Sequence, residues 1–478
     1  MTEPHTAPLD GLDAAELWTR LHDAATGRGG SAARELAARC RVDGVDRLGW
    51  VRPPSWPLLR SALTPILAAL RNRGDRAVLV LGTGGWSFAA RALAELTEAA
   101  GPAGSAAPGP PVHSFDSLDS LDPWTIRHTV ARGETRPGAY LAISGSGSTL
   151  ETRVLTETVT ALSPAGVVRL CDKSAPPDSY PLSVNDAADH VAMLGAPLST
   201  AFLAPAALAD PEALADAYTG LADRHHELAM TAVEQATAMD TRGTPHVRIA
   251  APAWAGDGLR TWLLQLGRQV LGGKSPAYRP QVDVLSADEL PGTPGREAAL
   301  DLRAAPADLA GLLALMYTAG IFAACLALRA GLRPVEHGNV SAYKRLLADL
   351  PEQPRPPARP PARPTPEQVP GFAAGWLAAR PDLRRLHLVR YGGAPAPLPA
   401  AASLAATTGL PCEVHTGSAW NHHSYQAVYA ESDTAVLIWA GPVQDGPLHT
   451  ASHTLRRLAE ATHASLADRS VLIETTGG

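Results

Sequence analysis

The sequence predicts an α/β fold with two doubly wound parallel sheets, each with its own set of helices, and a helical middle between them. Apolar strand segments alternate with amphipathic helical segments along two stretches of the chain. Each strand segment runs into glycine or polar residues, as strands of a parallel sheet do at their carboxyl ends. The 478 residues, 45% of them hydrophobic, exceed what one compact core accommodates, so we expect more than one domain.

An N-terminal helical segment is expected over residues 1–75, followed by a first sheet domain over 76–210. The domain contains runs of apolar residues typical of buried strands and, between them, segments with helical spacing. The expected strands are 76–81, 111–117, 139–144, 166–174 and 190–194. The expected helices are 87–100, 122–132 and 148–162.

Residues 211–350 form the helical middle, which also contributes part of the second domain. It carries two long helical segments, 211–239 and 308–332, and two strand segments, 245–254 and 281–287. A linker over 351–369 holds eight prolines, which favour an extended, exposed chain. The rest of the second domain is residues 370–478, where the expected strands are 385–393, 411–417, 434–441 and 469–475.

Composition limits the partners and the compartment. The net charge is −6 with no long run of one sign, so we expect neither nucleic acid nor a membrane surface as a partner. The start of the chain lacks the pattern of a signal peptide, and the four cysteines show no metal-ligand spacing, which indicates a cytoplasmic protein with reduced thiols. The apolar stretch 308–332 favours a buried helix, with a membrane span as the alternative.

The stretch AISGSGSTLE, residues 142–151, ends a predicted strand and opens a predicted helix. Backbone N–H groups and the positive end of a helix converge at such a point, and anions bind there. The hydroxyl residues that can add donors are Ser144, Ser146, Ser148 and Thr149. The loop lacks the lysine of a nucleotide triphosphate loop, so a phosphate monoester fits it better. The alternative is a tight turn with an ordinary helix cap.

A second glycine loop, LGTGGWSFAA, covers residues 81–90. Two such loops in one sheet predict a shared crevice at neighbouring strand ends. A dinucleotide site is the alternative, but the GxGxxG pattern is not satisfied and Phe115–Ser117 offers a poor ribose acid. We therefore expect no cofactor.

Together LGTGGWS and SGSGSTLET resemble the sugar isomerase (SIS) domain, and most closely that of the glucose-6-phosphate isomerase family. The resemblance implies SIS-type, flavodoxin-like domains and a homodimer. It also implies a phosphate site at Ser144, Ser146, Ser148 and Thr149, with Gly84 and Gly85 against the sugar.

Three later stretches extend the resemblance to roughly residues 75–440. The segment TWLLQLGRQVLGGKS is similar to a segment of the family, and Gln265 and Lys274 are the matching residues. The segment GLRPVEHGNVSAYKRLL is similar to another, in which Lys344 falls on the family's active-site lysine. The stretch CEVHTGSAWNHH resembles one in the isomerase part of fused transaldolase–isomerase proteins, with His415 on the matching histidine. The order of the pieces is that of this subgroup.

The chain also departs from the family. Gly145 stands where the family has a lysine, and Pro197 or a neighbour stands where it has an arginine. We therefore expect the substrate to be a modified or amino sugar phosphate. A non-catalytic sugar-phosphate-binding protein and other chemistry in a specialised-metabolite pathway stay open.

The resemblance implies an enzyme that isomerises a phosphorylated sugar between its aldose and ketose forms through an enediol intermediate. Such a reaction needs a group that opens the ring, a carbon base and a group that stabilises the enediolate. The candidates are His415, as the ring-opening histidine, Lys344, and Glu336 as the base because it lies near Lys344 in the chain. Gln265 is expected to bind substrate. The histidines of HTGSAWNHH, His415, His422 and His423, raise the alternative of a metal site, but adjacent histidines seldom share a metal, so no metal is expected.

Overall fold

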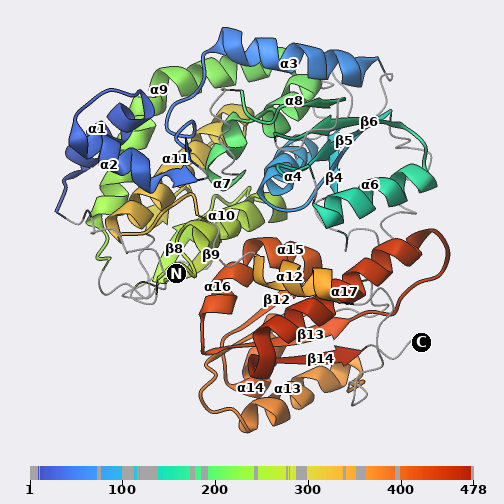
Figure 1. Ribbon diagram of the computed structural model, residues 1–478. Helices are drawn as coiled ribbons and strands as arrows, with labels where there is room; N and C mark the ends of the chain where they lie inside the picture. The colour runs from blue at the N-terminus through green and yellow to red at the C-terminus, as the bar shows by residue number, and fades with distance from the viewer. Residues whose placement is uncertain are drawn as a thin grey trace. The chain divides into compact units, whose positions relative to one another are not determined.

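The structure is a computed structural model that describes residues 9, 11–42, 44–72, 77–99, 112–115, 118, 138–147, 149–172, 178–184, 192–241, 246–275, 278, 280–286, 299–336, 341–350, 362–392 and 399–474. The chain divides into two compact units, coloured along the chain in Figure 1. Unit 1 comprises Met1–Asp116, Pro137–Thr149 and Ala165–His337. Unit 2 comprises Ser117–Arg136, Leu150–Pro164 and Gly338–Gly478.

Unit 1 begins with the expected helical segment. Asp13 caps the first helix by accepting the N–H of Glu16, and Leu17, Trp18 and Leu21 bury one face of it. The elements are α1 (Ala14–Ala25), α2 (Ser31–Arg39), the short antiparallel pair β1 (Arg41–Val42) and β2 (Val45–Asp46), and α3 (Trp56–Arg71).

A five-stranded parallel sheet forms the centre of unit 1. Its strands are β3 (Val78–Leu81), β4 (Val112–Phe115), β5 (Ala139–Ile143), β6 (Gly166–Leu170) and β7 (Ser179–Tyr180), in the order β4-β3-β5-β6-β7. Strand β3 is buried along its whole length, as its run of valine and leucine predicts. After β3 the chain adds β4 on one side and then β5 on the other. The ends of β3 and β5 are therefore a topological switch point, where ligands bind in such sheets.

The strand predicted over residues 190–194 is wrong. Residues from Ala192 form the short helix α7 (Ala192–Gly195), followed by η2 (Ala196–Leu198) and α8 (Thr200–Ala209). A short apolar run fits a buried strand and a buried helix equally well, and here the segment packs against the helices α4, α10 and α11. The last strand of the sheet is β7 instead.

The rest of unit 1 combines long helices with a small sheet. Helix α9 (Pro211–Ala238) packs along α11 (Leu309–Arg329), and α10 (Asp257–Val270) packs on α4 (Gly85–Ala99). The parallel strands β8 (His246–Ala250), β9 (Gln281–Leu285) and β10 (Leu300–Asp301) pair in the order β10-β8-β9. Among the described helices α11 alone is long and apolar enough to cross a membrane, and 83% of its most apolar window is buried inside the protein.

Unit 2 is built on a second parallel sheet, drawn in orange and red in Figure 1. Its strands are β11 (Arg385–Tyr391), β12 (Cys412–Thr416), β13 (Thr434–Ala440) and β14 (Ser470–Glu474), in the order β12-β11-β13-β14. The described helices are α6 (Leu150–Leu162), α12 (Ser341–Asp349), η4 (Pro366–Gln368), α13 (Val369–Ala378), α14 (Ala401–Thr408), α15 (Gly417–His423), α16 (Tyr425–Ala430), η5 (Gly446–Leu448), α17 (His449–Leu466) and η6 (Ala467–Arg469).

Apolar side chains cover one face of this second sheet. Leu386 and Leu388 of β11, with Leu437 and Trp439 of β13, pack against α13 and α14 in one buried cluster. The opposite face carries His387, which pairs in register with Glu413 of β12. Successive side chains of a strand alternate between faces, so the polar residues gather on one side.

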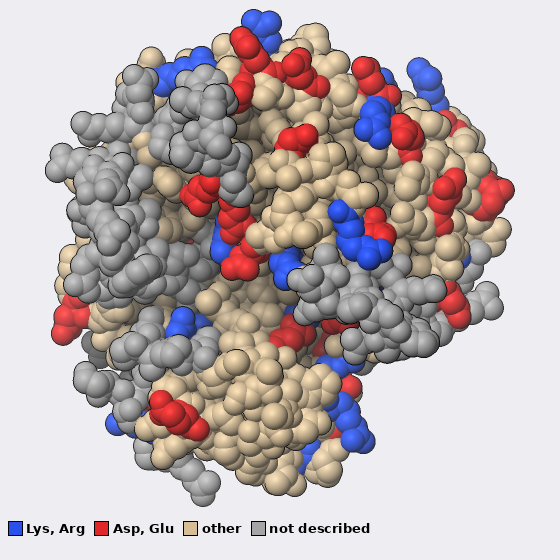
Figure 2. All heavy atoms as spheres, turned by 180° about the vertical axis from the view of Figure 1, so that it is seen from behind, with Lys and Arg blue, Asp and Glu red and all other residues tan. Residues whose placement is uncertain are grey.

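These parallel sheets with their helices confirm the predicted α/β class. The helix predicted over residues 122–132 lies outside the described residues. On the face drawn in Figure 2, the Lys and Arg side chains of the described residues are interspersed with Asp and Glu side chains.

Candidate functional site

The predicted anion loop follows β5 at the switch point of unit 1. Its hydroxyl groups bond to one another: Ser144 Oγ lies 2.9 Å from Thr149 Oγ1, and Ser146 Oγ lies 3.5 Å from the same atom. Gly147 takes a positive φ of 71°, which a glycine adopts without strain. Ser148 lies outside the described residues. The loop therefore presents hydroxyl groups and a bare backbone where α6 begins.

The glycine loop after β3 lies beside the serine loop, because β3 and β5 are neighbours in the sheet. A Cβ on Gly82 would come within 2.3 Å of Ser87 Oγ and 2.9 Å of the Ile143 carbonyl oxygen, so the backbones approach closely there. Gly84 has a φ of 90°, and Gly85 is the first residue of α4. The expected neighbouring of the two loops at adjacent strand ends is confirmed.

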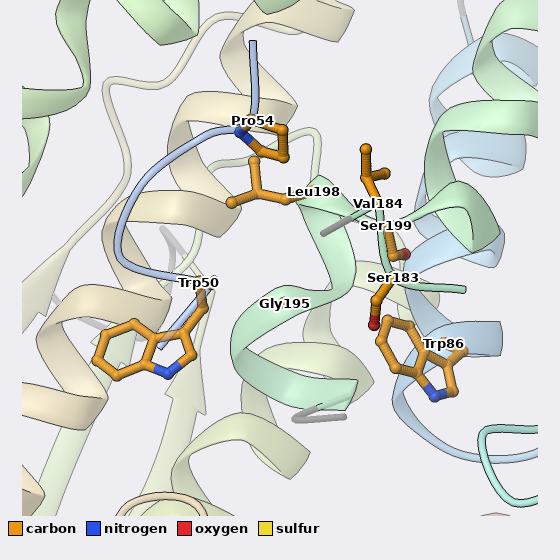
Figure 3. A pocket seen from close by; sticks show the side chains of 9 residues that line it. Trp50, Pro54, Trp86, Ser183, Val184, Gly195, Leu198 and Ser199 are labelled. Atoms are coloured by element: carbon orange, nitrogen blue, oxygen red, sulfur yellow. The ribbon is translucent and has the colours of Figure 1, made fainter. Parts of the chain in front are cut away.

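Trp86 connects the serine loop to a pocket in unit 1. Its Nε1 lies 3.3 Å from the position that a Cβ on Gly145 would take. The pocket holds about 290 Å³ of space, part of it open to solvent (Figure 3). Its lining residues are Gly49, Trp50, Pro54, Trp86, Ser183, Val184, Gly195, Leu198 and Ser199. A small hollow of mixed polar and apolar lining therefore adjoins the loop.

Unit 2 contains a buried acid–base pair. Glu151, in the first turn of α6, is only 2% exposed, and His422 of α15 places Nε2 3.3 Å from its Oε1. Burial raises the pKa of Glu151, but the hydrogen bond and charge of His422 and the charge of Lys344 outweigh burial, and the pKa lies below its ordinary value. Glu151 thus carries a negative charge inside the protein, with His422 hydrogen-bonded to it and the charge of Lys344 acting on it.

Lys344 lies exposed on α12, in the same unit as Glu151. The preceding residue, Tyr343, is fully buried and meets the ring of Tyr425 edge-on, with 4.8 Å between the ring centroids. Burial raises the pKa of Tyr343 well above its ordinary value, with the charge of Glu151 adding to the effect. Tyr343 therefore remains a neutral phenol near the acid–base pair, and it anchors the turn of helix that carries Lys344.

A second polar cluster in unit 2 contains the predicted His415. Its Nε2 lies 2.8 Å from Glu413 Oε2, and the Nε2 of His387 lies 3.5 Å from Glu413 Oε1. The three ligand-type atoms lie within 4.8 Å of one another, so the residue types match a metal site, although the sequence predicts no metal. Trp420 donates its indole N–H to His387 Nδ1 over 3.1 Å.

The other predicted residues lie in unit 1. Gln265 of α10 is 2% exposed, and its Oε1 has no hydrogen-bond partner within the part of the chain that the structure describes. Glu336 is half exposed and lies 3.9 Å from Arg333. Lys274, matched to the family by resemblance, donates its ammonium group to the carbonyl oxygens of Arg333 and Pro334. The expected closeness of Glu336 to Lys344 stays a prediction, because the two residues belong to different units.

Sequence reasoning misses the pairing of Glu151 with His422. A glutamate in the first turn of a helix is expected to stabilise its own helix start, and the backbone amide of Glu151 does contribute to the low pKa of the carboxyl, but the stronger partner is His422. The two residues are 271 positions apart in the chain, so no local sequence pattern predicts their contact. For Glu413 and His415 a signal exists: residues two apart on a strand share a face.

Comparisons with known proteins give fold-level likenesses alone. No family model matches the chain, and no curated protein matches it. Among solved structures, the chain is similar to a hypothetical protein from Thermus thermophilus, with 17% identity, 70% of this chain and 95% of that chain covered, and a TM-score of 0.49. It is similar to tagatose-6-phosphate ketose/aldose isomerase from Escherichia coli, with 14% identity, 70% and 98% covered, and a TM-score of 0.41. It is also similar to glucosamine-6-phosphate deaminase from Thermotoga maritima, with 12% identity, 59% of this chain and 93% of that chain covered, and a TM-score of 0.36.

Proposed function

We propose that this protein is an enzyme of the SIS type that interconverts an aldose and a ketose form of a phosphorylated sugar through an enediol intermediate. The observation that carries the proposal is the buried Glu151–His422 pair, and Glu151 comes two residues after a loop suited to phosphate. Burying a carboxylate costs free energy of folding, and groups with perturbed pKa values are concentrated at functional sites.

The serine loop binds the phosphate of the substrate in this proposal. Ser144, Ser146 and Thr149 supply hydroxyl donors, and the first turn of α6 supplies N–H groups and the positive end of the helix. No lysine or arginine occurs among residues 144–149, so the loop binds by neutral donors. Glu151 follows Thr149 by two residues in the chain, which supports the proposal that one substrate meets both the loop and Glu151.

His422 moves the ring-opening proton. Histidine is the side chain whose ordinary pKa suits proton exchange near neutral pH. The hydrogen bond with Glu151 fixes the orientation of the imidazole and stabilises the imidazolium that forms. Lys344, whose charge acts on Glu151, stabilises the negative enediolate. The sequence predicts His415 for ring opening and Glu336 as the carbon base. In this proposal His422 opens the ring, and His415 and Glu336 stay candidates for the second proton transfer.

The substrate is a phosphosugar other than plain glucose 6-phosphate in this proposal. Gly145 stands where the resembling family carries a lysine, and a Cβ at this position would lie 3.3 Å from Trp86 Nε1. The loop therefore lacks the family's cationic side chain, which supports a different phosphosugar. The homodimer and the cytoplasmic location implied by the sequence stay predictions.

A panel of ketose and aldose phosphates, including amino sugar phosphates, tests the proposal. Calorimetry measures binding, and each ligand is then incubated with the protein and assayed for its isomer. We expect at least one phosphosugar to bind and to be isomerised, while the unphosphorylated sugar does not bind. Binding without isomerisation supports the non-catalytic alternative, and failure of every phosphosugar to bind contradicts both.

A further inference from the structure

The polar cluster on β11 and β12 is buried at a position where apolar side chains would cost less free energy. His387 is 4% exposed within a strand otherwise rich in leucine and valine, and Trp420, which contacts it, is fully buried. Glu413 and His415 extend the cluster to the edge strand, with side chains 29% and 13% exposed. Buried polar groups cost free energy unless they are satisfied, so the contacts within the cluster decide what it does.

The hydrogen bond from Trp420 fixes the protonation of His387. An indole nitrogen always donates, so His387 Nδ1 must be the acceptor in the 3.1 Å contact. A neutral imidazole carries one proton, which then lies on Nε2. That nitrogen is the one that faces Glu413 at 3.5 Å. His387 therefore directs an N–H group toward the carboxylate.

This tautomer argues against a metal ion at the cluster. A histidine that binds a metal through Nε2 needs its proton on Nδ1, where it would oppose the N–H of Trp420. Glu413 instead faces the two imidazoles, one with each carboxylate oxygen: Oε2 lies within hydrogen-bond distance of His415 Nε2, at 2.8 Å, and Oε1 lies 3.5 Å from His387 Nε2. The proton of neutral His415 is then on Nε2, and its lone pair is on Nδ1.

We propose that Trp420, His387 and Glu413 form a positioning relay that makes His415 a proton acceptor at Nδ1, and that the cluster is not a metal site. The role in turnover rests on the proposed function. Proton transfer balances simply: a substrate hydroxyl or C–H bond breaks, the proton forms an N–H bond at His415 Nδ1, and the electron pair stays on the substrate. Glu413 stabilises the imidazolium through its contact with the Nε2–H group of His415. In the reverse step the proton on Nδ1 returns to the substrate.

Nitrogen NMR of protein with labelled histidine and tryptophan tests the relay without any substrate. We expect the proton of His387 on Nε2 and a scalar coupling between Trp420 Nε1 and His387 Nδ1 across the hydrogen bond. Trp420→Phe abolishes the coupling and shifts the Nδ1 signal. The matched control is Trp439→Phe, since Trp439 of β13 is as buried as Trp420 and its indole nitrogen has no partner among the described residues. A proton on Nδ1 of His387 in the unsubstituted protein overturns the relay.

Turnover of a phosphosugar that the panel shows to be isomerised separates a positioning role from a structural one. We expect Trp420→Phe and His387→Leu to lower kcat about tenfold or more with KM unchanged, since general acid–base catalysis contributes about a hundredfold or more. His387→Gln, whose amide can donate to Glu413, restores part of the kcat. Equal kcat for His387→Leu and the unsubstituted protein overturns the relay. If no phosphosugar is turned over while the NMR pattern holds, the proposed function fails and the hydrogen-bonded relay stands.

A titration with Zn²⁺ alone provides the third arm. We expect no stoichiometric binding that shifts the nitrogens of His387 and His415. Binding of one Zn²⁺ with a dissociation constant below about 1 μM, lost in His387→Leu, would show a metal site and overturn the proposal.

Discussion

His422 Nε2 lies 3.3 Å from Oε1 of Glu151, although 271 residues separate the two in the chain. The contact joins the start of α6 to the end of α15 within unit 2. It gives the residue that follows the serine loop a partner able to exchange protons, and the proposed chemistry depends on it.

Removing single hydroxyl groups from the serine loop should weaken phosphosugar binding. Thr149→Val and Ser144→Ala each delete a hydroxyl that takes part in the 2.9 Å contact. Hydrogen bonds to a charged group contribute about 1.5–3 kcal/mol, so we expect the dissociation constant to rise about tenfold or more in calorimetry. Thr160→Val on α6 is the control, since its hydroxyl bonds to the helix backbone. Equal affinities for Thr149→Val and the control would argue against phosphate binding at this loop.

Two glycine substitutions should change stability in opposite directions. Gly82→Ala places a methyl group 2.3 Å from Ser87 Oγ and 2.9 Å from the Ile143 carbonyl oxygen, and overpacking costs about 1–3 kcal/mol. Gly220→Ala, inside α9 with nothing within 4 Å, should stabilise the protein by about 0.5–1 kcal/mol. Urea unfolding measures both. A Gly82→Ala protein as stable as Gly220→Ala would contradict the close approach of β3 and β5.

Lys274 should make the stability of the protein depend on pH. Burial lowers the pKa of Lys274 to about 7, whereas an unfolded lysine titrates near about 10.4. Between these values the unfolded chain binds the extra proton, so the free energy of unfolding rises with pH by at most about 1.4 kcal/mol per unit. The lost stability is greatest below pH 7, where the folded protein must hold a buried charge.

Lys274→Met tests this dependence. We expect its unfolding free energy, measured in urea at about pH 7 and about pH 9, to rise less between the two values than that of the unsubstituted protein. The same rise in both proteins would show that the two carbonyl contacts of Lys274 keep the ammonium group charged throughout.

Local patterns predict the sheets because burial on both faces of a parallel strand leaves a clear mark in the sequence. The runs AVLVL and AYLAI, each leading into glycine or serine, form the neighbouring strands β3 and β5. The stretch HVAML has a similar composition, yet residues 192–195 form the helix α7 among other helices. Only tertiary contacts distinguish the two outcomes, and a single sequence does not contain them.

The sequence predicts the parts of the candidate site that lie on consecutive residues, but not the contacts between segments far apart in the chain. The serine loop lies on consecutive residues, so its position follows from the strand and helix around it. The partner of Glu151 comes from α15, and the partner of His387 comes from β12. The first contact depends on how unit 2 brings α6 and α15 together, and the second on the strand order β12-β11-β13-β14. Resemblance singles out His415, whereas His387 lies unremarked within an apolar strand.

The most direct measurement is the uptake of solvent deuterium into a bound phosphosugar, compared between the unsubstituted protein and Glu151→Gln. The substitution keeps the size of the side chain and removes the charge that orients His422. If Glu151 and His422 transfer protons on a sugar phosphate, deuterium appears on the sugar carbon with the unsubstituted protein, and the rate falls about a hundredfold in Glu151→Gln while phosphosugar binding persists. Equal exchange rates in the two proteins, or no exchange with any bound phosphosugar, would contradict the account.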